Sequence, residues 1–378
     1  MARNGVNRPP RARADPRGWG WETGFLSAVP LAIVAAGLEM PPVVRFLAAA
    51  IAVVPLAGLM GRSTESIAHR LGPGVGGLLN ATFGNAAELI LALLALRRGL
   101  DGVVKASLVG SIVGNLLLVL GASILAGGIK HPVQKFNRTV ASNGSTLMVL
   151  ASVGLLIPAL FHGVVGPGEA RLEHRLSLGV SVLLIFTYGL SLLFSLVTHR
   201  DLFGHKGTRS PLDDEPGPWG VRRSAIILLT ATAFVAWMSE ILVEAVVPAG
   251  EALGMSQVFM GVIVVAIIGN AAEHSTAILV AMKDQMDLAV GIAMGSALQV
   301  ALFVAPVLVF ASYLRPDPGP MDLLFSTFEV VAVILAALVA RMAAEDGESN
   351  WLEGAMLLMV YVILGFAFYM LPTAGHLR

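Results

Sequence analysis

The five residues Gly84-Asn85-Ala86-Ala87-Glu88 recur 185 positions later as Gly269-Asn270-Ala271-Ala272-Glu273. The register of this match continues along the chain without a gap. At the same offset, Gly110-Ser111 aligns with Gly295-Ser296, Leu117 with Leu302 and Val119 with Val304. A register shared over this length indicates that the chain carries two copies of one structural unit.

The residues around the two motifs are overwhelmingly apolar. Of 378 residues, 56% are hydrophobic and 13% are charged, whereas about 25% are charged in a typical soluble domain. Runs of about 20 apolar residues, long enough to span a bilayer as a helix, fill most of the chain. Eleven such spans are predicted, at 24–40, 43–61, 73–97, 102–127, 140–161, 175–197, 224–248, 257–282, 286–312, 322–342 and 351–371. The predicted fold class is an all-α polytopic membrane protein.

The two copies are predicted to lie in opposite orientations in the membrane. Each copy holds five spans, and because five is odd, the second copy enters the bilayer from the other side. The expected fold is therefore one extra N-terminal helix followed by two inverted five-helix repeats. The predicted boundaries are 1–42 for a basic N-terminal segment with the extra helix, 43–197 for the first repeat, 198–223 for a cytoplasmic linker and 224–378 for the second repeat.

Charge predicts the orientation and excludes several classes of function. Most of the 25 Lys and Arg residues fall on the cytoplasmic side when the N-terminus is placed inside, which leaves the C-terminus outside. We expect a multi-pass protein of a prokaryotic inner cell membrane. The 25 basic and 25 acidic residues cancel, which argues against nucleic-acid binding. The absence of cysteine excludes thiolate catalysis and metal–thiolate sites.

Each motif places a carboxylate in the middle of a predicted span. A charged side chain at that depth costs about 2.5–3.5 kcal/mol on insertion scales, which makes Glu88 and Glu273 candidates for function. Asn85 and Asn270 lie three residues before these acids, so each asparagine shares a helix face with its glutamate. A carboxylate beside an amide oxygen is suited to hard cations. The alternative is a protonated glutamate that serves helix packing, and the identity of the two pentapeptides favours ion binding.

Further oxygen atoms are available beside these pairs. Gly84 and Gly269 permit a break in each helix that would free backbone carbonyls for coordination. Four side chains in the following spans are candidates to complete the six to eight oxygen ligands of a calcium ion: Ser111, Asn115, Ser296 and Gln299. Polar residues between membrane helices can also serve only to bridge the helices, and both interpretations of these four stay open.

Three more titratable residues are candidates for a secondary role. His274 is predicted as a proton relay because histidine titrates near neutral pH, although it points about 100° away from Glu273 on a regular helix. Glu65 and Glu240 are candidates for an access gate or for outer binding positions. The alternative for both is a solvated carboxylate at the membrane interface.

The motifs resemble the two signature repeats of the calcium/proton exchangers, within the calcium/cation antiporter superfamily. The resemblance extends to Asn80-Ala81-Thr82-Phe83, Gly295-Ser296-Ala297-Leu298-Gln299 and Ser349-Asn350-Trp351-Leu352-Glu353-Gly354. It implies that Glu88 and Glu273 bind calcium or protons in alternation, with Asn85 and Asn270 beside them. The sodium/calcium branch carries Ser/Thr-Pro-Glu instead of Asn-Ala-Ala-Glu, so the resemblance implies protons as the counter-ion.

The predicted function is a secondary antiporter that exports calcium from the cytoplasm in exchange for protons by alternating access. Either calcium or protons would neutralise two carboxylates that are costly to leave charged in a low-dielectric core. A sodium or potassium/proton antiporter of the same fold is the alternative. We expect no enzyme activity and no cofactor, since neither a His-Glu-x-x-His nor a Gly-x-Ser-x-Gly pattern occurs. The expected partners are calcium, protons and the lipid bilayer, and assembly into a homo-oligomer stays open.

Overall fold

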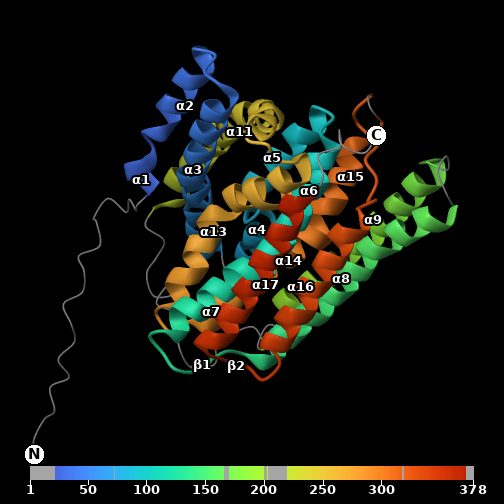
Figure 1. The fold of residues 1–378 in the computed structure, drawn as a ribbon. Coiled ribbons are helices and arrows are strands. Elements are labelled where there is room, and N and C mark those ends of the chain that lie inside the picture. The colour runs from blue at the N-terminus through green and yellow to red at the C-terminus, as the bar shows by residue number, and fades with distance from the viewer. Residues whose placement is uncertain are drawn as a thin grey trace, which may run out of the picture.

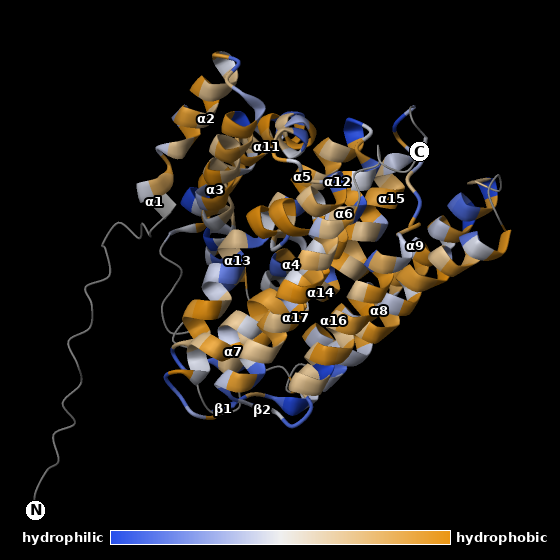
Figure 2. Cartoon of the chain, viewed as in Figure 1, coloured by the Kyte–Doolittle hydropathy of each residue, from blue (hydrophilic) through white to orange (hydrophobic). Residues whose placement is uncertain are grey.

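A computed structural model describes residues 22–71, 73–165, 170–199, 202, 219–316 and 319–371, and helices account for nearly all of these residues (Figure 1). Most of the predicted basic N-terminal segment and most of the predicted linker lie outside these residues. Figure 2 shows hydrophobic residues along the helices and hydrophilic residues gathered towards the two ends of the molecule. This distribution is the one expected of a membrane-embedded bundle.

The elements of the two halves follow each other in closely similar order, with η marking a π-helical segment. The first half contains α1 (Glu22–Phe25), α2 (Ala28–Gly37), α3 (Pro42–Leu71), α4 (Pro73–Phe83), α5 (Ala86–Arg97), α6 (Asp101–Val113), η1 (Gly114–Val119), α7 (Leu120–Gly128), β1 (Gln134–Lys135), α8 (Arg138–Val165), α9 (Ala170–Leu193) and η2 (Phe194–Thr198). The second half contains α11 (Val221–Ala252), α12 (Gln257–Phe259), η3 (Met260–Val265), α13 (Ala266–Ala281), α14 (Met286–Gln299), η4 (Val300–Val304), α15 (Ala305–Ser312), α16 (Thr327–Ala343), β2 (Glu348–Ser349) and α17 (Trp351–Met370).

The predicted all-α membrane class is confirmed, whereas the count of eleven spans stays a prediction. Eight helices of the described chain are long and apolar enough to cross a membrane. The other three predicted spans take a different form. Helix α2 has 10 residues, α16 has 17 residues, and the predicted span 73–97 is divided into α4 and α5. Helix α16 starts later than predicted because Ser326 and Glu329 form a capping box at its N-terminus.

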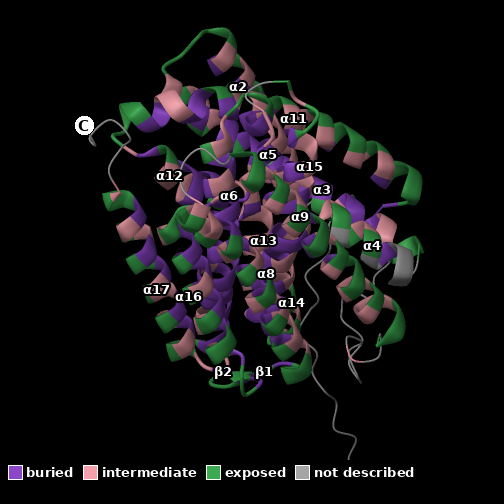
Figure 3. Ribbon diagram, turned by 90° about the vertical axis from the view of Figure 1, so that its right-hand side faces the viewer, coloured by how far each residue is buried: buried purple, intermediate pink, exposed green. Residues whose placement is uncertain are grey.

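In the centre of the bundle, helices of each repeat pack against helices of the other repeat. The long helices α3 and α11 pack against each other, α5 packs against α11 of the other repeat, and α13 packs against α3. Figure 3 shows buried residues concentrated on the central helices, among them α6 and α14. Because α5 and α13 carry the two motifs, this packing between the repeats brings both motifs to the middle of the molecule.

A short antiparallel ribbon joins the two repeats at one end of the bundle. Strand β1 pairs with β2, with Gln134 opposite Ser349 and Lys135 opposite Glu348. We call this end the ribbon face; it also carries the turn between α13 and α14. The other end, which carries the turn between α5 and α6, is called the opposite face (Figure 1).

Candidate functional site

The first glutamate lies at a break between two helices. Helix α4 ends at Phe83 and α5 begins at Ala86, so Glu88 belongs to the first turn of α5. Its Oε1 atom accepts a hydrogen bond from the hydroxyl of Ser111 on α6 and another, at 2.5 Å, from Nδ2 of Asn270 on α13. The carboxylate of one motif is therefore held by the asparagine of the other motif.

A network of hydrogen bonds connects polar side chains of the second repeat with polar side chains of the first repeat. Nδ2 of Asn85 donates to Oε1 of Gln299 at 2.7 Å, and the hydroxyl of Ser296 donates to Oδ1 of Asn85 at 3.0 Å. Nδ2 of Asn115 donates to the Ser296 hydroxyl at 3.1 Å. The pair Asn85 and Ser296 repeats the pair Asn270 and Ser111, whose Nδ2 and Oγ atoms lie 3.1 Å apart. The site thus has approximate twofold symmetry.

The glycine of each motif lies against the glutamate of the other motif. A Cβ atom at Gly269 would lie 3.1 Å from Cγ of Glu88, and one at Gly84 would lie 3.7 Å from Oε1 of Glu273. The expected helix break is present at Gly84 but not at Gly269, because α13 runs unbroken from Ala266 to Ala281. Gly269 instead allows close approach between two elements, which is the other reason for a glycine in a helix.

Four oxygen atoms of the site are buried and accept no hydrogen bond from any described residue. They are Oε2 of Glu88, Oε2 of Glu273, Oδ1 of Asn115 and Oδ1 of Asn270. A buried acceptor without a donor costs about 1–3 kcal/mol, and more when it is charged. The described residues contain no cluster of three or more His, Cys, Asp or Glu side chains. This set of carboxylate, amide and hydroxyl oxygens is suited to protons or to a hard cation.

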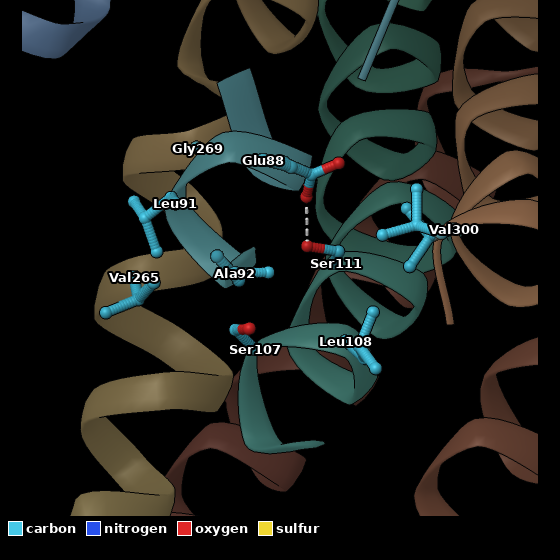
Figure 4. Close-up of a pocket in the computed structure, with 11 residues that line it drawn as sticks. Glu88, Leu91, Ala92, Ser107, Leu108, Ser111, Val265, Gly269 and Val300 are labelled. Atoms are coloured by element: carbon cyan, nitrogen blue, oxygen red, sulfur yellow. Dashed lines mark hydrogen bonds between the residues drawn. The ribbon is translucent and has the colours of Figure 1, made fainter. Parts of the chain in front are cut away.

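A small cavity of about 20 Å³ adjoins Glu88. Its lining includes Ser111 and Ser107 of α6 and Leu91 of α5, together with apolar residues of η3, α13 and η4. Figure 4 shows Glu88 and Ser111 pointing toward each other at this cavity, joined by their hydrogen bond. Since Ser107 and Leu91 lie further along α6 and α5 towards their common turn, the cavity extends from the glutamate in the direction of the opposite face.

The segments that precede the two motifs are packed differently. On the opposite face, η3 lies tightly on α6, where a Cβ at Gly261 would be 2.5 Å from Cβ of Ala106, and one at Gly110 would collide with the carbonyl of Val262. In the other repeat, Gly76 of α4 instead packs against the Ala68 carbonyl of α3.

The glycines of α14 are correspondingly open. No atom of the described residues lies within 4 Å of a Cβ built at Gly291 or Gly295, the repeat counterparts of Ala106 and Gly110. Asn80 of α4 is exposed, whereas its counterpart Val265 is 2% exposed. The bundle is therefore closed around η3 and open around α4. These glycines were not among the predicted site residues, although the 185-residue offset relates Gly76 to Gly261.

A family model described as sodium/calcium exchanger protein matches residues 42–197 and 223–370. The chain belongs to this family. The Ca(2+)/H(+) antiporter of Aphanothece halophytica is 46% identical over 367 residues, which cover 94% of this chain and 97% of that protein. The Ca(2+)/H(+) antiporter ChaA of Bacillus subtilis is 45% identical over 346 residues, which cover 91% and 97%. A solved structure of native YfkE has a TM-score of 0.79 and 42% identity, and covers 92% of this chain and 98% of that one. The predicted resemblance to calcium/proton exchangers is confirmed.

The remaining candidates, His274, Glu65 and Glu240, make no described hydrogen bond to the central site. Nε2 of His274 is buried and has no hydrogen-bond partner among the described residues. Glu65 is exposed on α3. Glu240 of α11 pairs with Arg98 at 2.7 Å, and this hydrogen bond, aided by the charge of Glu240, raises the pKa of the Arg98 guanidinium. The relay role of His274 and the gate roles of Glu65 and Glu240 stay predictions.

Proposed function

We propose that this protein is a secondary antiporter that exports Ca²⁺ from the cytoplasm in exchange for one or two protons per ion. The observation that carries the proposal is the set of four buried oxygen atoms that accept no hydrogen bond, two of them from carboxylates. Two ionised carboxylates carry two negative charges, which one divalent cation or two protons would neutralise. The names of the relatives at 45% and 46% identity support calcium and protons as the substrates.

Glu88 and Glu273 are proposed to bind calcium and protons in turn. The hydrogen bonds from Ser111 and Asn270 engage Oε1 of Glu88, which leaves Oε2 as the free ligand atom. Oδ1 of Asn270 and Oδ1 of Asn115 are free in the same way. Because both ions require the same oxygens, binding of one displaces the other, and a state with two bare carboxylates is penalised by its low-dielectric surroundings. These two effects together give obligatory exchange.

Neutral amides and hydroxyls are proposed to hold these carboxylates in place. Asn85 bonds to Gln299 and Ser296 at once, so its position depends on two residues of α14. Backbone carbonyls freed by the break at Gly84 would add oxygen ligands, and at Gly269 the glycine would serve close packing. Metal-binding roles for Asn85, Asn270, Gly84, Ser111, Ser296 and Gln299 form part of this proposal, whereas the unbroken helix α13 frees no carbonyl for coordination at Gly269.

Access to the site is proposed to alternate between the two faces. The structure is closed at η3 and open at α4. Because the two halves share one architecture and are related by a pseudo-twofold axis, an exchange of conformation between them would close α4 and open η3. We place the N-terminus and the ribbon face in the cytoplasm of a prokaryotic cell and the C-terminus outside, in accordance with the distribution of Lys and Arg. The open side then faces the cytoplasm, where calcium would be loaded.

Gly269→Ala is expected to weaken calcium binding without unfolding the protein. The new Cβ would lie 3.1 Å from Cγ of Glu88 and force the glutamate to shift by a few tenths of an ångström. Alanine favours a helix by about 1 kcal/mol over glycine, so stability should not fall. We expect the KM for Ca²⁺ to rise about 3- to 10-fold, measured in proteoliposomes, because a small displacement of a ligand weakens coordination. Gly179→Ala, at an open position of α9, is the control, and an equal KM in both variants would contradict the role of Gly269.

The proposed function is tested with vesicles that hold an imposed pH gradient, acidic inside, and contain the purified protein. Calcium, sodium and potassium are added separately while a pH-sensitive dye reports the gradient. We expect micromolar calcium to collapse the gradient and the monovalent ions to leave it intact. A response to sodium or potassium alone would show that the substrate is a monovalent cation and not calcium. Calcium movement without any proton flux would refute proton coupling.

A further inference from the structure

The two hairpins that carry the motifs close through the same unusual turn. Gly99, between α5 and α6, has φ of 73°, and Asp284, between α13 and α14, has φ of 61°. These two residues are 185 positions apart, so they are counterparts in the repeat. In each left-handed turn the backbone N–H of Gly99 or Asp284 donates to the carbonyl three residues earlier, at 3.0 Å in both cases, and the second lone pair of that carbonyl can accept from an outside donor.

Arg315 is that donor for the first hairpin. Its side chain, 9% exposed, comes from the segment after α15 in the second repeat. Nη1 donates to the Leu96 carbonyl at 2.7 Å and to Oδ1 of Asp101 at 2.6 Å, while Nη2 donates to Oδ2 of Asp101 at 2.5 Å. One guanidinium thus joins the end of α5 to the start of α6.

Gln134 is the donor for the second hairpin. This residue of β1, 1% exposed, follows α7 in the first repeat. Its Nε2 donates to the Ala281 carbonyl at 2.8 Å and to Oδ1 of Asp284 at 3.3 Å. Ala281 is the repeat counterpart of Leu96, so each hairpin is tied at the same carbonyl by a side chain from the opposite repeat.

Hydrogen bonds to the opposite repeat hold each motif helix at both of its ends. At the site, Asn85 bonds to Gln299; at the far end, the Leu96 carbonyl just before the end of α5 bonds to Arg315. Gln299 and Arg315 bracket one continuous helical stretch, formed by η4 and α15. Helix α13 is held in the same way against α6, η1 and α7, through Asn270 with Ser111 and through Ala281 with Gln134. A helix fixed at both ends cannot tilt without losing one of its ties.

We propose that Arg315 and Gln134 are positioning residues of the ion site, each holding a motif helix against the other repeat's helical stretch that contains a π-helical segment, α14–η4–α15 for α5 and α6–η1–α7 for α13. The inference rests on the proposed function for the identity of the ion. The two ties differ in strength, because Arg315 makes a bidentate charge-assisted pair, whereas Gln134 offers a neutral amide. Loss of Arg315 therefore disturbs α5, with Glu88 and Asn85, more than loss of Gln134 disturbs α13.

The transport test uses Arg315→Gln and the milder Asp101→Asn in proteoliposomes. We expect the KM for Ca²⁺ to rise at least about 10-fold while kcat stays within about threefold, because the oxygens are displaced but the chemistry of the ligands is unchanged. The double variant should resemble the Arg315→Gln variant, since both changes break one interaction. Lys135→Gln is the control: it removes an exposed pair with Glu348 on the ribbon face and should leave KM unchanged. A loss of kcat with KM unchanged, or an equal rise in KM for Lys135→Gln, would overturn the positioning role.

Hydrogen exchange tests the same inference without any ion. Arg315→Gln should speed amide exchange in the last turns of α5 at least about fivefold and leave α13 as it is, whereas Gln134→Leu should do the reverse. Equal effects on both helices, or no effect on either, would overturn the inference. If wild-type protein shows no calcium-driven proton movement, the proposed function fails, and this measurement still decides whether the ties hold the helices.

Discussion

Replacement of either central glutamate by glutamine is expected to lower calcium-driven proton movement by about 100-fold or more. Glutamine keeps the shape of the side chain but removes one negative charge, so bound Ca²⁺ leaves an uncompensated positive charge in the core of the bundle. An unneutralised charge at the membrane centre costs about 2.5–3.5 kcal/mol on insertion scales, which corresponds to roughly 100-fold in a rate. Proton exchange suffers as well, because the amide does not titrate. Initial rates in proteoliposomes measure this loss for Glu88→Gln and Glu273→Gln.

Glu329→Gln is the matched control for these two variants. Glu329 is also buried, at 6% exposure, but its carboxylate accepts from the backbone of Ser326 in the capping box of α16, outside the ion site. Glutamine can take the same place in a capping box, so this variant should fold and exchange ions normally. All three proteins should elute from a size-exclusion column in detergent at the volume of the folded wild-type protein. Exchange above a tenth of the wild-type rate in either site variant would refute the assignment of that glutamate.

The class of the fold could be predicted because it depends on local features of the sequence, whereas the ion-binding roles of the site residues stay a prediction. Long apolar runs identify membrane helices by their length alone. The repeated pentapeptides identified Glu88, Glu273, Asn85 and Asn270, and the structure brings three of these side chains into hydrogen bonds with each other's repeat. Membership of the exchanger family followed from the same motifs and is confirmed by the family match over both repeats.

The different conformations of the two motifs could not be predicted, because identical pentapeptides have different surroundings. The first motif lies at a helix break and the second lies inside the unbroken helix α13. Helix α4, with Pro73 and several glycines, packs against α3, whereas η3, rich in β-branched residues, packs against α6. These are contacts between segments far apart in the chain, which no local pattern records. The pairing of Glu240 with Arg98 escaped prediction for the same reason, since the two residues lie on different repeats.

Gly295→Leu is expected to leave the protein folded and able to bind calcium, yet to reduce exchange about 50-fold or more, since the closing step would be blocked. In this structure the position is free, because no described atom lies within 4 Å of a Cβ built there. Its counterpart Gly110 lies directly beneath the Val262 carbonyl of η3, where no side chain fits. If the two repeats exchange roles during transport, α4 must approach α14 at Gly295 as closely as η3 approaches α6 now. A leucine side chain would fill the space that α4 needs.

Two measurements distinguish a blocked closing step from misfolding or from loss of calcium binding. Equilibrium binding of Ca²⁺ to the Gly295→Leu protein in detergent should stay within about threefold of wild type, because the open state is unaltered, while the exchange rate in proteoliposomes falls. Gly179→Leu is the control, since this glycine of α9 is exposed and equally free of close neighbours among the described residues. It should bind and exchange as wild type does. Wild-type exchange in Gly295→Leu would mean that α4 never closes on α14, and access would then have to alternate by a movement other than an exchange of conformation between the two repeats.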